Sequence, residues 1–146
     1  MINNIFKFVF LIIMFMNLDG VHSAGGVSKS NSNDNAKVFI ISPENNSTVT
    51  NPVKIVFGAS GMKIVPAGVN ENFSGHHHLL IDVKELPDFS KPIPSNKNYL
   101  HFGKGQRSAE IHLKKGIHTL QLLLGDHMHI PHTSPIYSEK LIITVK

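Results

Sequence analysis

The histidines of this chain are concentrated in a way that indicates metal-ion chemistry. Nine of the ten lie after residue 75, and the 146-residue sequence contains no cysteine. The densest segment, Asp126–His132, holds three imidazoles, a carboxylate and a thioether. Imidazole with thioether is typical of copper, and imidazole with carboxylate is typical of copper(II) or zinc. The segment therefore indicates a copper or zinc site, and a plain polar loop rich in histidine is the alternative.

A second group is the triplet His76-His77-His78, which precedes the apolar run Leu79–Ile81. If this stretch is a strand, His77 shares the core face with Leu79 and Ile81, and His76 and His78 lie on the opposite face. Residues two apart on a strand are roughly 7 Å apart, so both imidazoles can reach one ion. An exposed, histidine-rich strand face is the alternative, and the triplet by itself favours it.

Three further histidines stand alone. His101 lies between two apolar residues, Leu100 and Phe102, so we expect its ring to point outward or to lie at a rim. His118 shares a face with alternate leucines of the following strand, so we expect it to be partly buried, either in the site or as a hydrogen-bonded core histidine. His112 is expected to be a solvated surface residue.

The elements that must position these side chains are all predicted to be strands. Gly and Pro punctuation recurs between short alternating segments, and no helical stripe of useful length occurs. Ile117–Leu124 is apolar on both faces, ends at Gly125, and follows a turn at Lys115-Gly116. The segment 86–98 contains three prolines and is expected to be an irregular crossover. The sequence thus predicts an all-β, immunoglobulin-like or fibronectin-like β-sandwich of about seven strands. The predicted strands cover 37–41, 53–57, 62–65, 76–83, 99–102, 109–113, 117–124 and 137–145.

The N-terminal region is predicted to be a signal peptide, residues 1–23. Lys7 precedes the apolar run Phe8–Met16, and Val21 and Ser23 suit signal peptidase at its −3 and −1 positions. The apolar stretch of about 14 residues is shorter than the roughly 20 that span a bilayer. We therefore expect a periplasmic or secreted protein with no membrane span in the mature chain.

The remaining chain divides into a leader and one domain. Residues 24–36 are rich in Gly, Ser and Asn and are expected to be flexible, and residues 37–146 form a single domain. The net charge is +4, but the lysines are scattered, so nucleic acid is a poor candidate partner. A metal ion is the expected partner, and another envelope protein is a further candidate.

Known catalytic templates are missing from the sequence. There is no Gly-x-Ser-x-Gly elbow, no thiol, no His-Glu-x-x-His motif and no phosphate-binding loop. The sequence therefore favours a binding module over an enzyme.

Three motifs resemble those of a known family. GHHHLLID at 75–82, HFGKGQ at 101–106 and HTLQLLLGDHMHIPH at 118–132 are similar to motifs of exported bacterial proteins grouped as a domain of unknown function, family 4399. The resemblance extends over about 66–145, and Arg107 departs from it where a Thr or Ser is expected. It implies no activity, but it implies that histidines within the three motifs act together.

We therefore predict one pocket at one end of the sandwich, lined by histidines of all three motifs. Asp126 is expected to be a direct metal ligand or to fix the tautomer of a liganding histidine. His77 and His112 are expected to lie outside the site. The alternative is a non-metal ligand- or protein-binding or structural module of the cell envelope that uses the histidines as a polar groove. The candidate metal ligands are His76, His78, His101, His118, Asp126, His127, His129 and His132.

Overall fold

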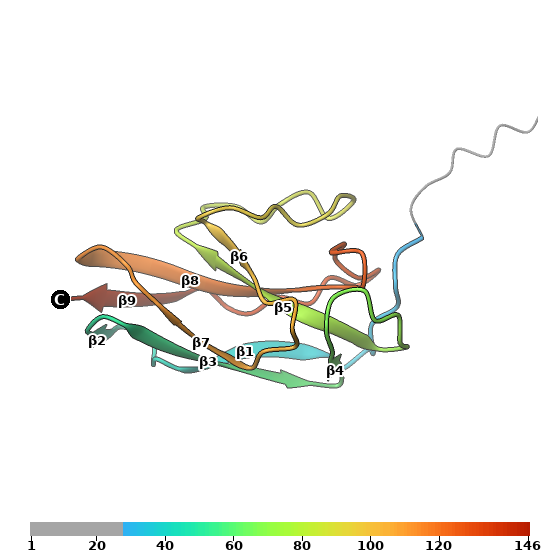
Figure 1. Cartoon of the computed structure of the whole chain (residues 1–146), viewed down its shortest axis with the longest axis horizontal. Helices are drawn as coiled ribbons and strands as arrows, with labels where there is room; N and C mark the ends of the chain where they lie inside the picture. Colours follow the sequence, from blue (N-terminus) through green and yellow to red (C-terminus); the bar gives the residue numbers. More distant parts are fainter. Residues whose placement is uncertain (1–27) are drawn as a thin grey trace, which may run out of the picture.

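The computed structural model describes residues 28–146, and Figure 1 shows them as two layers of strands. The predicted signal peptide and residues 24–27 of the leader lie outside the described residues. The described part contains nine strands and no helix, which confirms the all-β prediction. Residues 28–146 thus contain no helix that is long and apolar enough to cross a membrane. The strands are β1 (Lys37–Ser42), β2 (Ser47–Val49), β3 (Val53–Ser60), β4 (Lys63–Ile64), β5 (Ser74–Ile81), β6 (Tyr99–His101), β7 (Ser108–Ile111), β8 (Gly116–Gly125) and β9 (Leu141–Val145).

One strand lies in a segment where the sequence predicts none. β2 falls within the turn-rich stretch 44–50 and pairs in parallel with β9. Its three residues, Ser-Thr-Val, include two β-branched side chains, but the flanking Asn residues hide this short signal. With β2, the described part has nine strands, one more than the eight predicted ranges and more than the approximate count of seven.

The strands form two sheets that enclose the main core. One sheet has the order β1-β3-β7, and the other has the order β2-β9-β8-β5-β4, with β6 also paired to β5. Alternate residues of β3 and β8 meet between the sheets, including Ile55, Phe57, Leu120, Leu122 and Leu124. This alternation is the one that the period-two pattern of Ile117–Leu124 predicts.

The outer face of β5 and β8 is also covered. Leu80 and Leu123 pack with Ile93, which belongs to the proline-rich crossover, in a second and smaller apolar cluster. As a result all eight residues of β5 are buried. The histidine triplet is thus not an exposed strand face, because His76 and His78 are buried together with the rest of β5.

Strand register decides which histidines meet. In the antiparallel β5–β8 pair His76 is opposite Gly125, whereas Ile81 is opposite Leu120. In the β5–β6 pair His78 is directly opposite His101. One end of β5 therefore lies beside both His101 and the histidine-rich segment that follows β8.

Candidate metal centre

Three histidines from two neighbouring strands converge. His76 and His78 of β5 and His101 of β6 each offer a ring nitrogen, and these three atoms lie within 4.8 Å of one another. The ring centroids are 4.8 Å apart for His76 and His78, 4.9 Å for His76 and His101, and 5.1 Å for His78 and His101. The pairing of β6 with β5 therefore brings a histidine from a distant motif onto the face of the triplet.

His129 is the fourth member of the cluster. Its Nε2 lies 3.2 Å from Nε2 of His101, and its ring centroid is 4.7 Å from that of His101 and 4.9 Å from that of His76. The separation from His78 is wider, at 5.9 Å. A tetrahedral ion with bonds of about 2.0–2.1 Å places two ligand nitrogens about 3.3 Å apart. The spacing of the His101 and His129 nitrogens is thus close to that of two ligands of one ion. We call His76, His78, His101 and His129 the histidine cluster.

A tight turn after β8 holds His129 in place. Oδ1 of Asp126 accepts hydrogen bonds from the backbone N–H groups of Met128 at 2.8 Å and Ile130 at 2.9 Å, the two neighbours of His129. The N–H of His129 donates to the Asp126 carbonyl at 2.9 Å, and His129 has a φ of 66°. Left-handed backbone is uncommon outside glycine, but histidine is among the residues that adopt it more readily.

Asp126 therefore acts on the backbone of the turn. Burial alone would raise the pKa of its carboxyl, but hydrogen bonds from Ile130, Met128 and Ser30 outweigh this effect and lower the pKa. Within residues 28–146, the Asp126 carboxylate makes no direct hydrogen bond to a histidine ring, contrary to the expectation that it fixes a histidine tautomer. Its hydrogen-bond partners are backbone amides and a serine.

Two glycines leave room for the rings. A Cβ at Gly125 would lie 2.7 Å from Cε1 of His78, and a Cβ at Gly103 would lie 2.6 Å from Nε2 of His101. Neither distance is compatible with a side chain unless the ring moves. In the sequence, Gly125 stands out only as the end of an apolar strand, and Gly103 only as part of the HFGKGQ motif. Their position beside histidine motifs was the available signal that they make space for a site.

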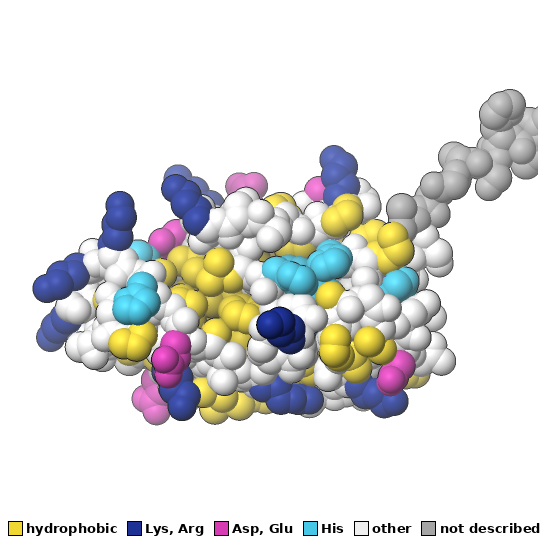
Figure 2. Space-filling view, in the orientation of Figure 1, with side chains coloured by type: hydrophobic (Ala, Val, Ile, Leu, Met, Phe, Trp, Pro, Cys, Tyr) yellow, Lys and Arg dark blue, Asp and Glu magenta, His cyan; other side chains and the backbone are white. Residues whose placement is uncertain are grey.

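The cluster combines buried and accessible imidazoles. His76 and His78 are 0% and 1% exposed, whereas His101 is exposed. Both ring nitrogens of His76 and Nδ1 of His78 have no hydrogen-bond partner among residues 28–146. Figure 2 shows adjacent histidine side chains near the middle of the face in view and others apart from them. The cluster is thus rooted in the sheet and reaches solvent on one side.

Burial keeps these rings neutral. Burial and then the neighbouring imidazoles lower the pKa of His76 to about 4 and that of His78 to about 2. Burial followed by the nearby His129 also lowers the pKa of His101. Neutral imidazole is the form that binds metal ions, so at neutral pH these rings are in the metal-binding state.

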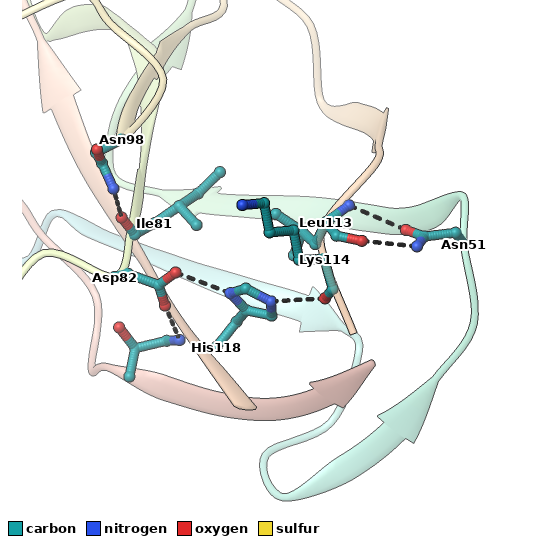
Figure 3. A network of polar contacts seen from close by, with 8 residues as sticks. Asn51, Ile81, Asp82, Asn98, Leu113, Lys114 and His118 are labelled. Carbon is teal, nitrogen blue, oxygen red and sulfur yellow. Dashed lines mark hydrogen bonds and ion pairs between the residues drawn. The ribbon is translucent and has the colours of Figure 1, made fainter. Parts of the chain in front are cut away.

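His118 does not join the cluster. Its ring lies instead between Asp82 and Lys114 (Figure 3). Its Nδ1 is 2.8 Å from Oδ2 of Asp82, and its Nε2 is 2.8 Å from the Lys114 carbonyl oxygen. Burial disfavours the charged ring, but the hydrogen bonds to Asp82 and Lys114 outweigh it and raise the His118 pKa. The shared face with the leucines of β8 correctly predicts partial burial. The expectation that His118 lines the pocket is wrong, because it lies toward the opposite end of β8 from Gly125.

The other candidates lie near the turn but are turned to other partners. Nδ1 of His127 is 3.5 Å from Oγ of Ser30. His132 is fully buried, and its Nε2 lies 2.9 Å from the Ser74 carbonyl oxygen. Burial lowers the His132 pKa, partly offset by that hydrogen bond. Of the eight predicted ligands, the histidine cluster thus contains four.

Neither His77 nor His112 is part of the histidine cluster. The ring of His77 points into the main core, with its centroid 5.2 Å from that of Phe57. His112 is exposed next to β7. His77 therefore shows that neighbours in the triplet belong to different environments.

Comparison with known proteins places the chain by sequence family alone. Neither the curated proteins nor the solved structures gave a match. A family model matches residues 55–146, a region that runs from within β3 to the end of the chain and includes the whole histidine cluster. The match agrees with the family that the three motifs resemble. The chain therefore belongs to the family described as a domain of unknown function, DUF4399.

Proposed function

We propose that this protein binds one copper(II) or zinc(II) ion through His76, His78, His101 and His129. The observation that carries the proposal is the convergence of three ring nitrogens within 4.8 Å, with His129 beside His101. A buried nitrogen without a hydrogen bond costs about 1–3 kcal/mol, and a shared ion would satisfy several at once. His101 and His129 would form the side of the site from which the ion enters.

The chemistry of the donors supports these two metals. Magnesium and calcium prefer oxygen ligands, and the four rings offer only nitrogen. Imidazole suits both zinc and copper, and copper(II) binds a given nitrogen site more tightly than zinc does. The ion would be held by uncharged ligands, because burial keeps the His76 and His78 rings neutral.

We further propose that the module works outside the cytoplasm, as a periplasmic or secreted protein. Support comes from Lys7, the apolar run Phe8–Met16 and the small residues before position 24. Mass spectrometry of the cell-envelope fraction should find a chain that begins at Ala24. An exported chain that still carries Met1 would contradict this proposal.

The metal proposal is tested on protein purified without a histidine tag. Metal content is measured first, and the metal-free protein is then titrated with copper(II) and with zinc(II). We expect a Kd well below about 10 μM, which corresponds to roughly −7 kcal/mol. The double variant His101→Ala/His129→Ala should bind at least about 100-fold more weakly, since it loses two of four ligands.

The control variant is His112→Ala, which removes an exposed imidazole outside the cluster. It should bind as the wild type does, and circular dichroism should confirm that both variants are folded. Equal affinity of the double variant and the control would contradict the proposal. So would a wild type that binds neither metal better than about 10 μM. A non-metal ligand- or protein-binding module would then be the better interpretation.

A further inference from the structure

The leader contacts the turn that carries His129. We call Ser30–Ser32 the strap. The sequence predicts this segment to be flexible, yet its backbone and side chains are hydrogen-bonded to residues 126–134. Ser32 donates from Oγ to the Ser134 carbonyl at 3.1 Å, and Thr133 Oγ1 donates to Oδ1 of Asn31 at 3.4 Å. The strap thus lies along the base of the histidine-rich segment.

Ser30 connects the two ends of that segment. Its Oγ donates to Oδ2 of Asp126 at 2.9 Å, and its N–H points to the same oxygen at 3.4 Å. Its carbonyl accepts the backbone N–H of Thr133 at 3.0 Å. Asp126 begins the turn and Thr133 follows it, so one leader residue closes the base of the loop.

The Asp126 carboxylate is held from two sides. Ser30 occupies Oδ2, while the amides of Met128 and Ile130 occupy Oδ1. These amides belong to the residues on either side of His129. A carboxylate that is fixed by Ser30 therefore fixes the backbone on both sides of a cluster ring. Without the Ser30 hydroxyl, Oδ2 of Asp126 loses its side-chain hydrogen bond and can turn toward water.

We propose that Ser30 is a positioning residue for the metal centre: through Asp126 it holds the ring of His129 against that of His101. This inference rests on the proposed function. Outer groups that orient liganding side chains commonly contribute 10–100-fold to metal affinity. Ser30 also precedes the region matched by the family model, so a residue that positions the metal centre lies outside that region.

The test compares three variants of the chain that begins at Ala24. Ser30→Ala removes the hydroxyl bound to Asp126, and Ser30→Thr keeps a hydroxyl there. Ser32→Ala is the matched control, because Ser32 is hydrogen-bonded to Ser134 instead of Asp126. Each is titrated with zinc(II), and amide hydrogen exchange of Met128 and Ile130 is followed in the metal-free protein.

We expect Ser30→Ala to bind zinc about tenfold more weakly and its two amides to exchange faster. Ser30→Thr and Ser32→Ala should resemble the wild type in both measurements. Wild-type zinc affinity in Ser30→Ala would overturn the inference, and so would weaker binding with unchanged amide exchange. If the wild type binds no metal, both the proposed function and the role of Ser30 in metal binding fail. Faster exchange in Ser30→Ala alone would then still support the link from Ser30 to Asp126.

Discussion

The two ends of the β5–β8 pair hold histidines in opposite states. At one end His76 and His78 are buried, and their pKa values fall because of that burial and the neighbouring imidazoles. At the other end burial of His118 is outweighed by its hydrogen bonds to Asp82 and Lys114, which raise its pKa. Histidine is thus held neutral at one end of the pair, whereas its charged form is favoured at the other end. The difference lies in its neighbours, which are imidazoles in one case and a carboxylate and a carbonyl in the other.

This contrast separates a ligand from a structural contact. A histidine with both nitrogens bound to oxygen acceptors has no lone pair to offer, because both nitrogens must carry protons. His118 is in that state and joins the end of β5 to the β7–β8 turn. In the cluster, His76 and His78 have buried nitrogens that no described residue satisfies. Unsatisfied nitrogens alone do not mark the candidate site, because His77 also has two of them but faces the core. The convergence of such nitrogens on one face of β5 marks it.

The largest expected effect is acid sensitivity of the metal-free protein. His76 and His78 have pKa values below the ordinary 6.5, so their contribution to stability is present above pH 6.5 and is lost as the pH falls. The shift of the His76 pKa from 6.5 to about 4 corresponds to about 3 kcal/mol. Urea unfolding at pH 7, 5.5 and 4 should show a loss of at least this size, because the lowered pKa values of His78 and His77 add to it. A free energy of unfolding that is constant over this range would contradict the neutral buried state.

The opposite end should respond in the opposite direction. Because the His118 pKa is raised, its contribution to stability is present below pH 6.5 and is lost as the pH rises through the folded-state pKa. In the wild type, Oδ1 of Asp82 accepts a hydrogen bond of 2.9 Å from the backbone N–H of Thr119. Asp82→Asn removes the carboxylate charge but keeps an oxygen that can accept this bond. The Asp82 side chain is 43% exposed, so screening limits the expected loss to about 1 kcal/mol at pH 6.

The matched control is Asp88→Asn. Asp88 is also an exposed carboxylate, but its hydrogen bonds go to Ser90. Unfolding at pH 6 and pH 8.5 compares the two variants, and zinc titration shows whether either affects the cluster. Only Asp82→Asn should lose the pH-dependent part of the stability, and neither should change zinc affinity. A weaker zinc affinity in Asp82→Asn would mean that the two ends are coupled.

The sequence predicts side-chain faces better than it predicts partners. Alternation correctly assigns His77 to the core, and His76 and His78 to the other face of β5. It also predicts partial burial of His118 from the leucines that follow. It does not show that the proline-rich crossover covers the outer face of β5, since that depends on tertiary packing of Ile93. Local pattern carries no information on what lies opposite a face.

The membership of the site depended on register and on one turn. His101 enters the cluster because it pairs with His78, and no spacing in the sequence fixes that pairing. His129 enters because Asp126 holds its backbone in the left-handed region. The density of histidine in Asp126–His132 points to the segment that contributes His129 to the cluster. It could not predict that His127 and His132 turn to Ser30 and Ser74 instead.

The smallest expected effect comes from the middle of the triplet, and it separates the two faces of β5. His77 is fully buried against Phe57, and neither ring nitrogen has a hydrogen-bond partner among the described residues. His77→Leu replaces it with an apolar side chain and removes two unsatisfied polar atoms. We expect the protein to become more stable by up to about 1 kcal/mol at pH 7, measured by urea unfolding.

Burial, and then the charge of Arg107, lowers the His77 pKa to about 4, so the variant should also lose part of the acid sensitivity. Zinc affinity should stay at the wild-type value, because the ring points away from the cluster. A tenfold loss of zinc affinity in His77→Leu, with the fold intact, would mean that the alternation of β5 does not separate ligand from core.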